Sequence, residues 1–421
     1  MLNKTLITVR SFVVSAGVTA ASSFVGVYGV YLGASAVLMG WLQSSSNALS
    51  NGGQLLWGKL SDSMGRRRPF LLGGSIALAL LWYFMGVVRT PVELIIVYAA
   101  ISLFASLITV NWFSLIADQT DSTTRGRFLA LINILSSIGT IISLFVMTFL
   151  FTGAVTNDIR IPFFAAAGSY VISGVLMSSL NEKKRERLAP THLRETIRNL
   201  KTHPLFYRYF IATNIQGIFW SMAWPMFPIT IVSIMHFTLT DVAFLTIASL
   251  GTTVMIQYLL GRVTDRVNRA PLIFANRVLL SAIPLLYAFF STFNEFIILE
   301  VYSGILGSIQ NVVMNSYLLD VIPQERKAEY LSIINGFNGV IYLTGALIGG
   351  YLLETMIAHF PLYLALVYSY SIVFAGRFAS SFMFVHLKEP EQKGRSPLSL
   401  YSLLYRPKQP GNPSGGTLRF R

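Results

Sequence analysis

Long apolar stretches recur along this chain, and they constrain its fold most because a helix that crosses a bilayer core needs about 20 apolar residues. Charged residues are 12% of the 421 residues and hydrophobic residues are 53%, whereas soluble domains are roughly 25% charged. The chain is therefore predicted to be an all-α polytopic membrane protein. Windows of about 20 residues predict twelve transmembrane helices, at 10–32, 36–58, 70–89, 92–117, 128–152, 162–180, 207–234, 240–261, 272–292, 295–319, 328–353 and 362–386.

Basic residues predict the orientation of these spans. Counted by loop, 29 of the 32 Lys and Arg fall on one side, and this count places Arg10 and Arg277 with the loops. Arg89 and Arg160 fall on the other side, and Arg377 falls inside the last span. The positive-inside rule then places both termini in the cytoplasm, and we expect a multi-pass protein of the plasma membrane. Because this asymmetry accounts for the net charge of +14, we expect no nucleic-acid partner.

An internal repeat divides the chain into two halves. Three residues recur at an offset of 202 or 203, namely Asp62 as Asp265, Asp118 as Asp320 and Asn133 as Asn335. Such self-similarity indicates duplication of a structural unit, so we predict two pseudo-symmetric six-helix bundles. The predicted boundaries are 1–180 for the first bundle, 181–206 for a cytoplasmic linker with an amphipathic helix, 207–386 for the second bundle and 387–421 for a flexible basic cytoplasmic tail.

The loop after the second span carries a motif. Residues 58–68 read Gly-Lys-Leu-Ser-Asp-Ser-Met-Gly-Arg-Arg-Arg, and residues 261–269 form a degenerate copy after the eighth span. The first motif resembles the signature loop of the major facilitator superfamily, and the resemblance covers residues 8–386. It implies two bundles that rock about a central cavity, and a cytoplasmic gate at the matching positions Gly58, Asp62, Gly65, Arg66, Gly261, Asp265 and Arg269.

These gate residues also have a physical interpretation of their own. Gly58 is expected to let two helices approach closely, and Gly65 to permit a tight turn. Asp62 can interact with the positive end of a neighbouring helix, or the charges can serve topology alone. The motif departs from the family pattern at Ser63, where Arg is frequent, and at Asn268, where Gly is usual. The resemblance therefore indicates the superfamily and no particular subfamily.

Polar residues inside the spans are candidates for solute binding, because such groups usually face protein or water. Their alternative role is hydrogen bonding between helices, and for Trp220 it is packing. Most are neutral, which suits an uncharged or amphipathic solute. The predicted substrate-binding residues are Asn47, Gln216, Trp220, Gln310, Asn311, Asn338 and Tyr342.

Two ionisable residues lie within predicted spans. Glu300 is the candidate for proton coupling, which requires a carboxyl group that changes protonation state, and its alternative is a water-exposed position near the outer surface. Arg377 is expected to pair structurally or to extend toward the interface, with anion binding as the alternative.

Together these features predict a secondary active transporter that moves a small organic solute across the membrane by alternating access, with or without proton coupling. The alternatives are a transporter-like solute sensor and a facilitator of a neutral metabolite. We expect no enzyme activity, cofactor or metal site, since the chain has no Cys and its five His are scattered. The expected partners are a small-molecule substrate, the lipid bilayer and, in a coupled transporter, a proton, and the chain is expected to act as a monomer.

Overall fold

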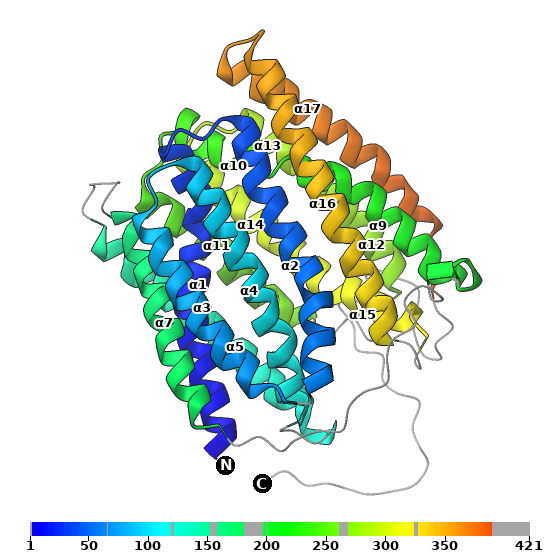
Figure 1. Cartoon of the computed structure of the whole chain (residues 1–421). Helices are drawn as coiled ribbons and strands as arrows, with labels where there is room; N and C mark the ends of the chain where they lie inside the picture. Colours follow the sequence, from blue (N-terminus) through cyan, green and yellow to red (C-terminus); the bar gives the residue numbers. More distant parts are fainter. Residues whose placement is uncertain are drawn as a thin grey trace, which may run out of the picture.

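The computed structural model describes residues 2–64, 66–118, 122–151, 158–180, 197–198, 200–260, 268–323 and 327–389, and all regular secondary structure in these ranges is helical. Most of the predicted linker and the tail beyond Glu389 lie outside the described residues. Successive long helices run in opposite directions across the molecule (Figure 1). We call the side where the first helix begins the N-terminal side, and the opposite side the far side.

Six long helices make up the N-terminal half. They are α1 (Leu2–Tyr31), α2 (Ala36–Met64), α3 (Arg68–Val87), α4 (Pro91–Asp118), α5 (Ser122–Leu150) and α7 (Arg160–Ser178). Within this half, α1 packs against α5 and α7, α3 against α7, and α2 against α4.

The C-terminal half also has six spans, of which several are interrupted. It begins with a short 3₁₀ turn, η1 (Leu200–Thr202). Three spans consist of several segments: the seventh of α9 (Pro204–Met222), α10 (Met226–Ile229) and the π-helical segment η2 (Thr230–Ile234), the ninth of α12 (Arg269–Ser281) and α13 (Ile283–Phe289), and the tenth of α14 (Phe293–Ile309), the π-helical segment η3 (Gln310–Met314) and α15 (Asn315–Val321). The other three are α11 (Leu239–Leu260), α16 (Lys327–Ile357) and α17 (Leu362–Ser381), which ends in the 3₁₀ turn η5 (Phe382–His386). These interruptions expose backbone groups that need other partners.

Eleven of the spans in the described residues are apolar enough to cross a membrane by length and composition. The twelfth is α2, which is long enough but carries the polar run Gln43–Gln54. A helix of this kind is tolerated where its polar face meets protein or water rather than lipid. The predicted fold of twelve helices in two bundles is confirmed.

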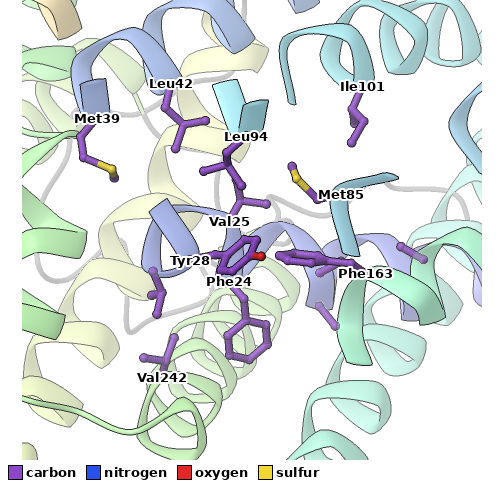
Figure 2. Packing of buried hydrophobic residues seen from close by; sticks show 14 of the residues in the cluster. Phe24, Val25, Tyr28, Met39, Leu42, Met85, Leu94, Ile101, Phe163 and Val242 are labelled. Carbon is purple, nitrogen blue, oxygen red and sulfur yellow. The ribbon is translucent and has the colours of Figure 1, made fainter. Parts of the chain in front are cut away.

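A hydrophobic core joins the two halves. It includes Phe24 of α1, Phe163 of α7 and Val242 of α11, each almost fully buried (Figure 2). Tyr28 packs at 5.5 Å from Phe163, measured between ring centroids, and its hydroxyl donates to the Val88 carbonyl at 2.6 Å. A second buried cluster lies within the C-terminal half around Tyr317 and Tyr330.

On the far side the halves meet closely along α2 and α16. A Cβ at Gly350 would lie 2.7 Å from the Ala36 carbonyl oxygen, and one at Gly40 would lie 3.0 Å from the Ala346 carbonyl oxygen. Farther along the same pair of helices, the Ser44 hydroxyl donates to the Leu343 carbonyl at 2.9 Å. Small residues therefore allow the two backbones to approach.

On the N-terminal side, α2 has a different environment. Leu56, Leu60 and Met64 are 66%, 47% and 51% exposed. The described contacts between α2 and α16 thus hold the far side together, whereas the last turns of α2 leave large apolar side chains uncovered.

Two arginines counted with the loops lie inside helices instead. Arg10 is buried in α1, where its Nε donates to the Ser173 hydroxyl at 2.8 Å and its guanidinium lies 4.0 Å from the Trp112 ring centroid. Arg277 is buried in α12. The loop count was wrong for both: α1 begins at Leu2, well before the window 10–32, and Arg277 already lies inside the predicted window 272–292.

Candidate substrate-binding site

The seventh span breaks after Met222, and Arg377 contacts the helical turn that precedes the break. Pro225 has no N–H and cannot continue α9, so the helix ends at Met222. Two carbonyls of its last turn accept hydrogen bonds from Arg377 of α17, that of Phe219 from Nε at 3.1 Å and that of Trp220 from an Nη at 2.5 Å. Arg377 is thus a side-chain cap for a broken helix, which also carries a partial negative charge at this end.

Beside the break lies a cavity of about 140 Å³, formed entirely by the C-terminal half. Its lining includes Gln216 and Trp220 of α9, Arg277 of α12, Gln310 of η3, and Asn338 and Tyr342 of α16. At 1.5 Å per residue, Gln216 lies about 18 Å along α9 and Arg277 about 12 Å along α12 from their N-terminal-side ends. Since a bilayer core is about 30 Å thick, the cavity lies near the middle of the membrane.

Arg277 supplies the positive charge in this cavity. Its side chain is 5% exposed, and among the described residues no carboxylate lies within ion-pairing distance of it. One Nη donates to Gln310 Oε1 at 3.4 Å, the other contacts the Met314 sulfur, and Nε has no hydrogen-bond partner. A thioether is a weak acceptor, so the donors of this guanidinium are poorly satisfied.

Neutral polar groups complete the cavity. Gln216 Nε2 donates to the Ser381 hydroxyl at 3.1 Å, and that hydroxyl donates to the Arg277 carbonyl at 3.0 Å, which links α9, α17 and α12. Asn338 Oδ1 is buried without a hydrogen-bond partner. The lining of the cavity therefore includes an unsatisfied acceptor as well as an unsatisfied donor.

The structure brings most of the predicted binding residues together. Gln216, Trp220, Gln310, Asn338 and Tyr342 all line the cavity. The two others lie elsewhere: Asn47 is on α2, where its Nδ2 donates to the Gln43 carbonyl at 2.8 Å, and Asn311 is exposed, one residue beyond Gln310. Their roles in binding remain predictions.

Glu300 lies outside the cavity, on α14 toward the far side. The Tyr287 hydroxyl of α13 donates to Glu300 Oε1 at 3.1 Å. No basic side chain in the described part of the chain forms an ion pair with Glu300. Its distance from Gln310 along the span is about 15 Å at the helical rise.

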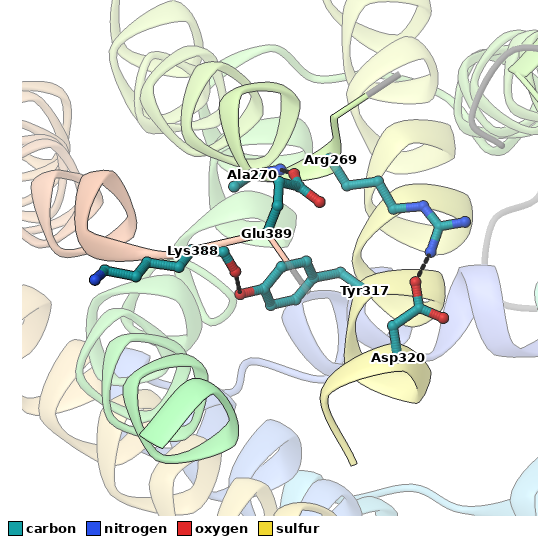
Figure 3. Close-up of polar contacts among 6 residues, drawn as sticks. All are labelled: Arg269, Ala270, Tyr317, Asp320, Lys388 and Glu389. Carbon is teal, nitrogen blue, oxygen red and sulfur yellow. Dashed lines mark hydrogen bonds and ion pairs between the residues drawn. The ribbon is translucent and has the colours of Figure 1, made fainter. Parts of the chain in front are cut away.

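At the N-terminal-side end of the C-terminal half, polar contacts join three segments (Figure 3). Arg269 of α12 pairs with Asp320 of α15 at 2.5 Å. Glu389 accepts from the Ala270 backbone N–H at 2.5 Å, and the Tyr317 hydroxyl donates to the Lys388 carbonyl at 2.8 Å. The predicted gate residue Arg269 therefore pairs within its own half.

The other predicted gate residues are described only in part. Gly65, Gly261 and Asp265 lie outside the described residues, and so does the side chain of Asp62. Arg66 is exposed at the end of the α2–α3 turn. The close approach expected at Gly58 is wrong, because a Cβ there would be 3.8 Å from Val110, an ordinary contact. The tight contact with α4 lies at Gly53 instead, against Ser106.

Sequence comparison decides the family. The profile of the Major Facilitator Superfamily matches residues 8–216 and again residues 209–409, so that each half matches separately. The chain belongs to the major facilitator superfamily. It is accordingly a multi-pass membrane transporter rather than an enzyme.

Two solved structures of transporters are similar to this chain in fold, and one further protein is similar to it in sequence. The nucleoside transporter NupG is 14% identical with a TM-score of 0.73, covering 92% of this chain and 99% of that one. The D-xylose–proton symporter is 15% identical with a TM-score of 0.66, covering 94% and 98%. A class H tetracycline resistance protein of Pasteurella multocida is 31% identical over 115 residues, 27% of this chain and 28% of that relative.

Arg277 and Tyr209 are among the cavity residues that the sequence analysis did not predict as binding residues. Arg277 lies inside the predicted ninth span, 272–292, and this position within an apolar window indicated that the arginine could be buried. Tyr209 lies two residues into the predicted seventh span, where aromatic residues are common interface anchors, so its sequence position gave no signal.

Proposed function

We propose that the protein is a secondary transporter that moves a small organic solute by alternating access, and that the solute binds in the cavity beside the α9 break. One observation supports this most directly: a polar cavity lies near mid-membrane while tight contacts between α2 and α16 close the far side. Alternating access operates around a binding site near the midplane, and this cavity lies at that depth within the C-terminal half.

The moving bodies in this proposal are the two predicted bundles, residues 1–180 and 207–386. The far-side contact between Gly40 of α2 and Gly350 of α16 separates when the transporter opens outward. We propose that the N-terminal side faces the cytoplasm of the plasma membrane, which is supported by the excess of basic residues there.

Proton coupling is proposed through Glu300. The support is its place inside a span, with a neutral tyrosine hydroxyl 3.1 Å away. A carboxyl group without a fixed counter-ion can exchange a proton as its surroundings change between the two states. The variant Glu300→Gln should abolish transport driven by a pH gradient and leave solute exchange intact; unchanged pH-driven uptake would remove Glu300 from the mechanism.

Flux across proteoliposomes tests transport itself, and cross-linking tests alternating access. The chain has no Cys, so a double variant Val37→Cys, Glu354→Cys carries the sole thiols; in the structure the Val37 N–H lies 3.4 Å from a Glu354 carboxylate oxygen, across the far side. A short bifunctional thiol reagent should stop flux in this variant, and flux should persist when the reagent is omitted.

The matched control places both thiols in one half. Tyr83 and Phe164 of α3 and α7 have ring centroids 5.6 Å apart, so Tyr83→Cys with Phe164→Cys cross-links two helices that move together. Flux should survive this cross-link. Solute binding without any flux would favour the sensor function over transport.

A further inference from the structure

We propose that the solute is a small organic anion, whose carboxylate binds Arg277 and whose body is about the size of one ring. This inference rests on the proposed function of the cavity and adds the chemical class of its occupant.

The argument begins with the cost of Arg277. A guanidinium taken out of water needs a counter-charge or strong acceptors. Arg277 is 5% exposed, its hydrogen-bond contacts are a glutamine oxygen at 3.4 Å and a methionine sulfur, and the nearest aromatic ring centroids are those of Phe384 at 5.7 Å and Trp220 at 5.9 Å. These neutral contacts replace the lost hydration of a cation only in part, and an anionic ligand would supply the acceptors that Arg277 needs.

A second arginine increases the positive charge. The guanidinium of Arg377 lies 4.7 Å from the Trp220 ring centroid, and that of Arg277 lies 5.9 Å from the same centroid. Arg377 donates to two backbone carbonyls and is satisfied. The two cations share one aromatic neighbour, and among the described residues neither has an acidic partner.

The geometry of the free donors favours a carboxylate. Nε of Arg277 has no hydrogen-bond partner. Of the two Nη atoms, one makes only the weak contact to the Met314 sulfur and the other only the 3.4 Å hydrogen bond to Gln310. Nε and an Nη form the planar fork that binds the two oxygens of a carboxylate. Gln216, beside this guanidinium, contributes an amide that can orient the rest of the solute.

Size limits the body of the solute. The cavity is about 140 Å³, and an apolar cavity of about 150 Å³ holds one benzene molecule. Tyr209, Trp220 and Tyr342 supply aromatic walls. A one-ring aromatic carboxylate therefore fits both the charge and the volume.

The test compares acids with neutral analogues of the same shape. Benzoate, 4-hydroxybenzoate and phenylacetate are each paired with the corresponding carboxamide, and binding to the purified full-length protein is measured by thermal-shift titration at pH 7. A hydrogen bond to a charged group contributes about 1.5–3 kcal/mol, so at least one acid should bind roughly 10- to 100-fold more tightly than its amide.

Substitutions of the buried arginines test which residue causes the preference for the acid over the amide. Arg277→Gln should remove the preference for the acid while the amide binds as before, and Arg277→Lys, which keeps the charge without the planar fork, should reduce it. Arg10→Gln, at a buried arginine of the other half, should retain it. Because the acid–amide comparison uses the wild-type protein, it remains decisive even if Arg277→Gln does not fold.

Three results would overturn the proposal: amides that bind as tightly as the acids, a preference that survives in Arg277→Gln, or no stabilisation of the wild type by any of the three acids. Flux measured in proteoliposomes distinguishes failure of this proposal from failure of the proposed transport function. Acid binding that depends on Arg277 without flux would uphold the anion site and refute transport, whereas flux of a neutral solute with no acid preference would do the reverse.

Discussion

Replacing each buried arginine of the C-terminal half with methionine should change stability in opposite directions. Arg377→Met removes the donors to the Phe219 and Trp220 carbonyls, which lie at 3.1 and 2.5 Å. A buried acceptor left without a donor costs about 1–3 kcal/mol, so two cost about 2–6 kcal/mol. The lost contact with the Trp220 ring, 4.7 Å away, adds about 0.5–2 kcal/mol.

Arg277→Met removes a cation of the same size from a similar depth but leaves no described carbonyl without a donor. Its described hydrogen-bond contacts are the glutamine oxygen at 3.4 Å and the methionine sulfur, and the Trp220 and Phe384 ring centroids lie 5.9 and 5.7 Å away. Replacing a buried charge that lacks a good partner with an apolar side chain is often neutral or stabilising by about 1–4 kcal/mol. The ligand-free protein should therefore be as stable as the wild type, or more stable.

Thermal unfolding of both variants in one detergent, followed by tryptophan fluorescence, measures the difference. A change of 1 kcal/mol shifts the midpoint by about 2–4 °C in domains of 150–250 residues and by about 1 °C in a chain as long as this one. The midpoint of Arg277→Met should therefore exceed that of Arg377→Met by about 3 °C or more. Arg377→Lys, which keeps one donor group, should recover part of the loss. Equal midpoints for the two methionine variants would refute the distinction between a capping arginine and an unsatisfied one.

Three further substitutions test other contacts. Gly349→Val should prevent α16 from packing on α9, whose backbone already lies against that position; expression of the folded protein at wild-type level would contradict this. Asp320→Asn should destabilise the protein by about 2 kcal/mol, since it removes the charged hydrogen bond between Asp320 and Arg269, and an unchanged unfolding midpoint would show that the pair contributes nothing. Tyr28→Phe removes the hydrogen bond to the Val88 carbonyl at 2.6 Å and should cost about 1 kcal/mol, whereas a more stable variant would show that burial of the hydroxyl outweighs that bond.

Hydropathy and the internal repeat were sufficient to predict the fold, because both depend on composition and on spacing along the chain. The polar helix α2 shows where composition alone fails, since its run Gln43–Gln54 excludes it from the apolar spans. The internal repeat predicts α2 as a span nevertheless, because each of the two repeated units must contain six helices. Of the interruptions, Pro225 gave a visible signal of the break after Met222, whereas the π-helical turn of η3 has no proline to mark it.

The cavity was harder to predict, since its residues come from α9, α12, η3 and α16 and meet only through packing. Neutral polar residues within apolar windows were visible as candidates, and five of them line the cavity. Arg277 was assigned to a loop because arginines near a span end usually lie at the interface. The predicted window, 272–292, begins only three residues after α12 does and already contains Arg277, so the loop count and not the window misplaced this residue.

The broken seventh span connects the cavity to the far-side closure. Gln216 and Trp220 of α9 line the cavity, and the last turn of the same helix is capped by Arg377. Beyond the break, Pro228 lies so close to α1 that a Cβ at Gly26 would come within 2.8 Å of it. An anion bound beside Trp220 would offset the repulsion between Arg277 and Arg377, and so stabilise the break at the point where α10 turns toward the other half. Occupancy and far-side closure are thus expected to reinforce each other, because both act on one short segment between Trp220 and Pro228.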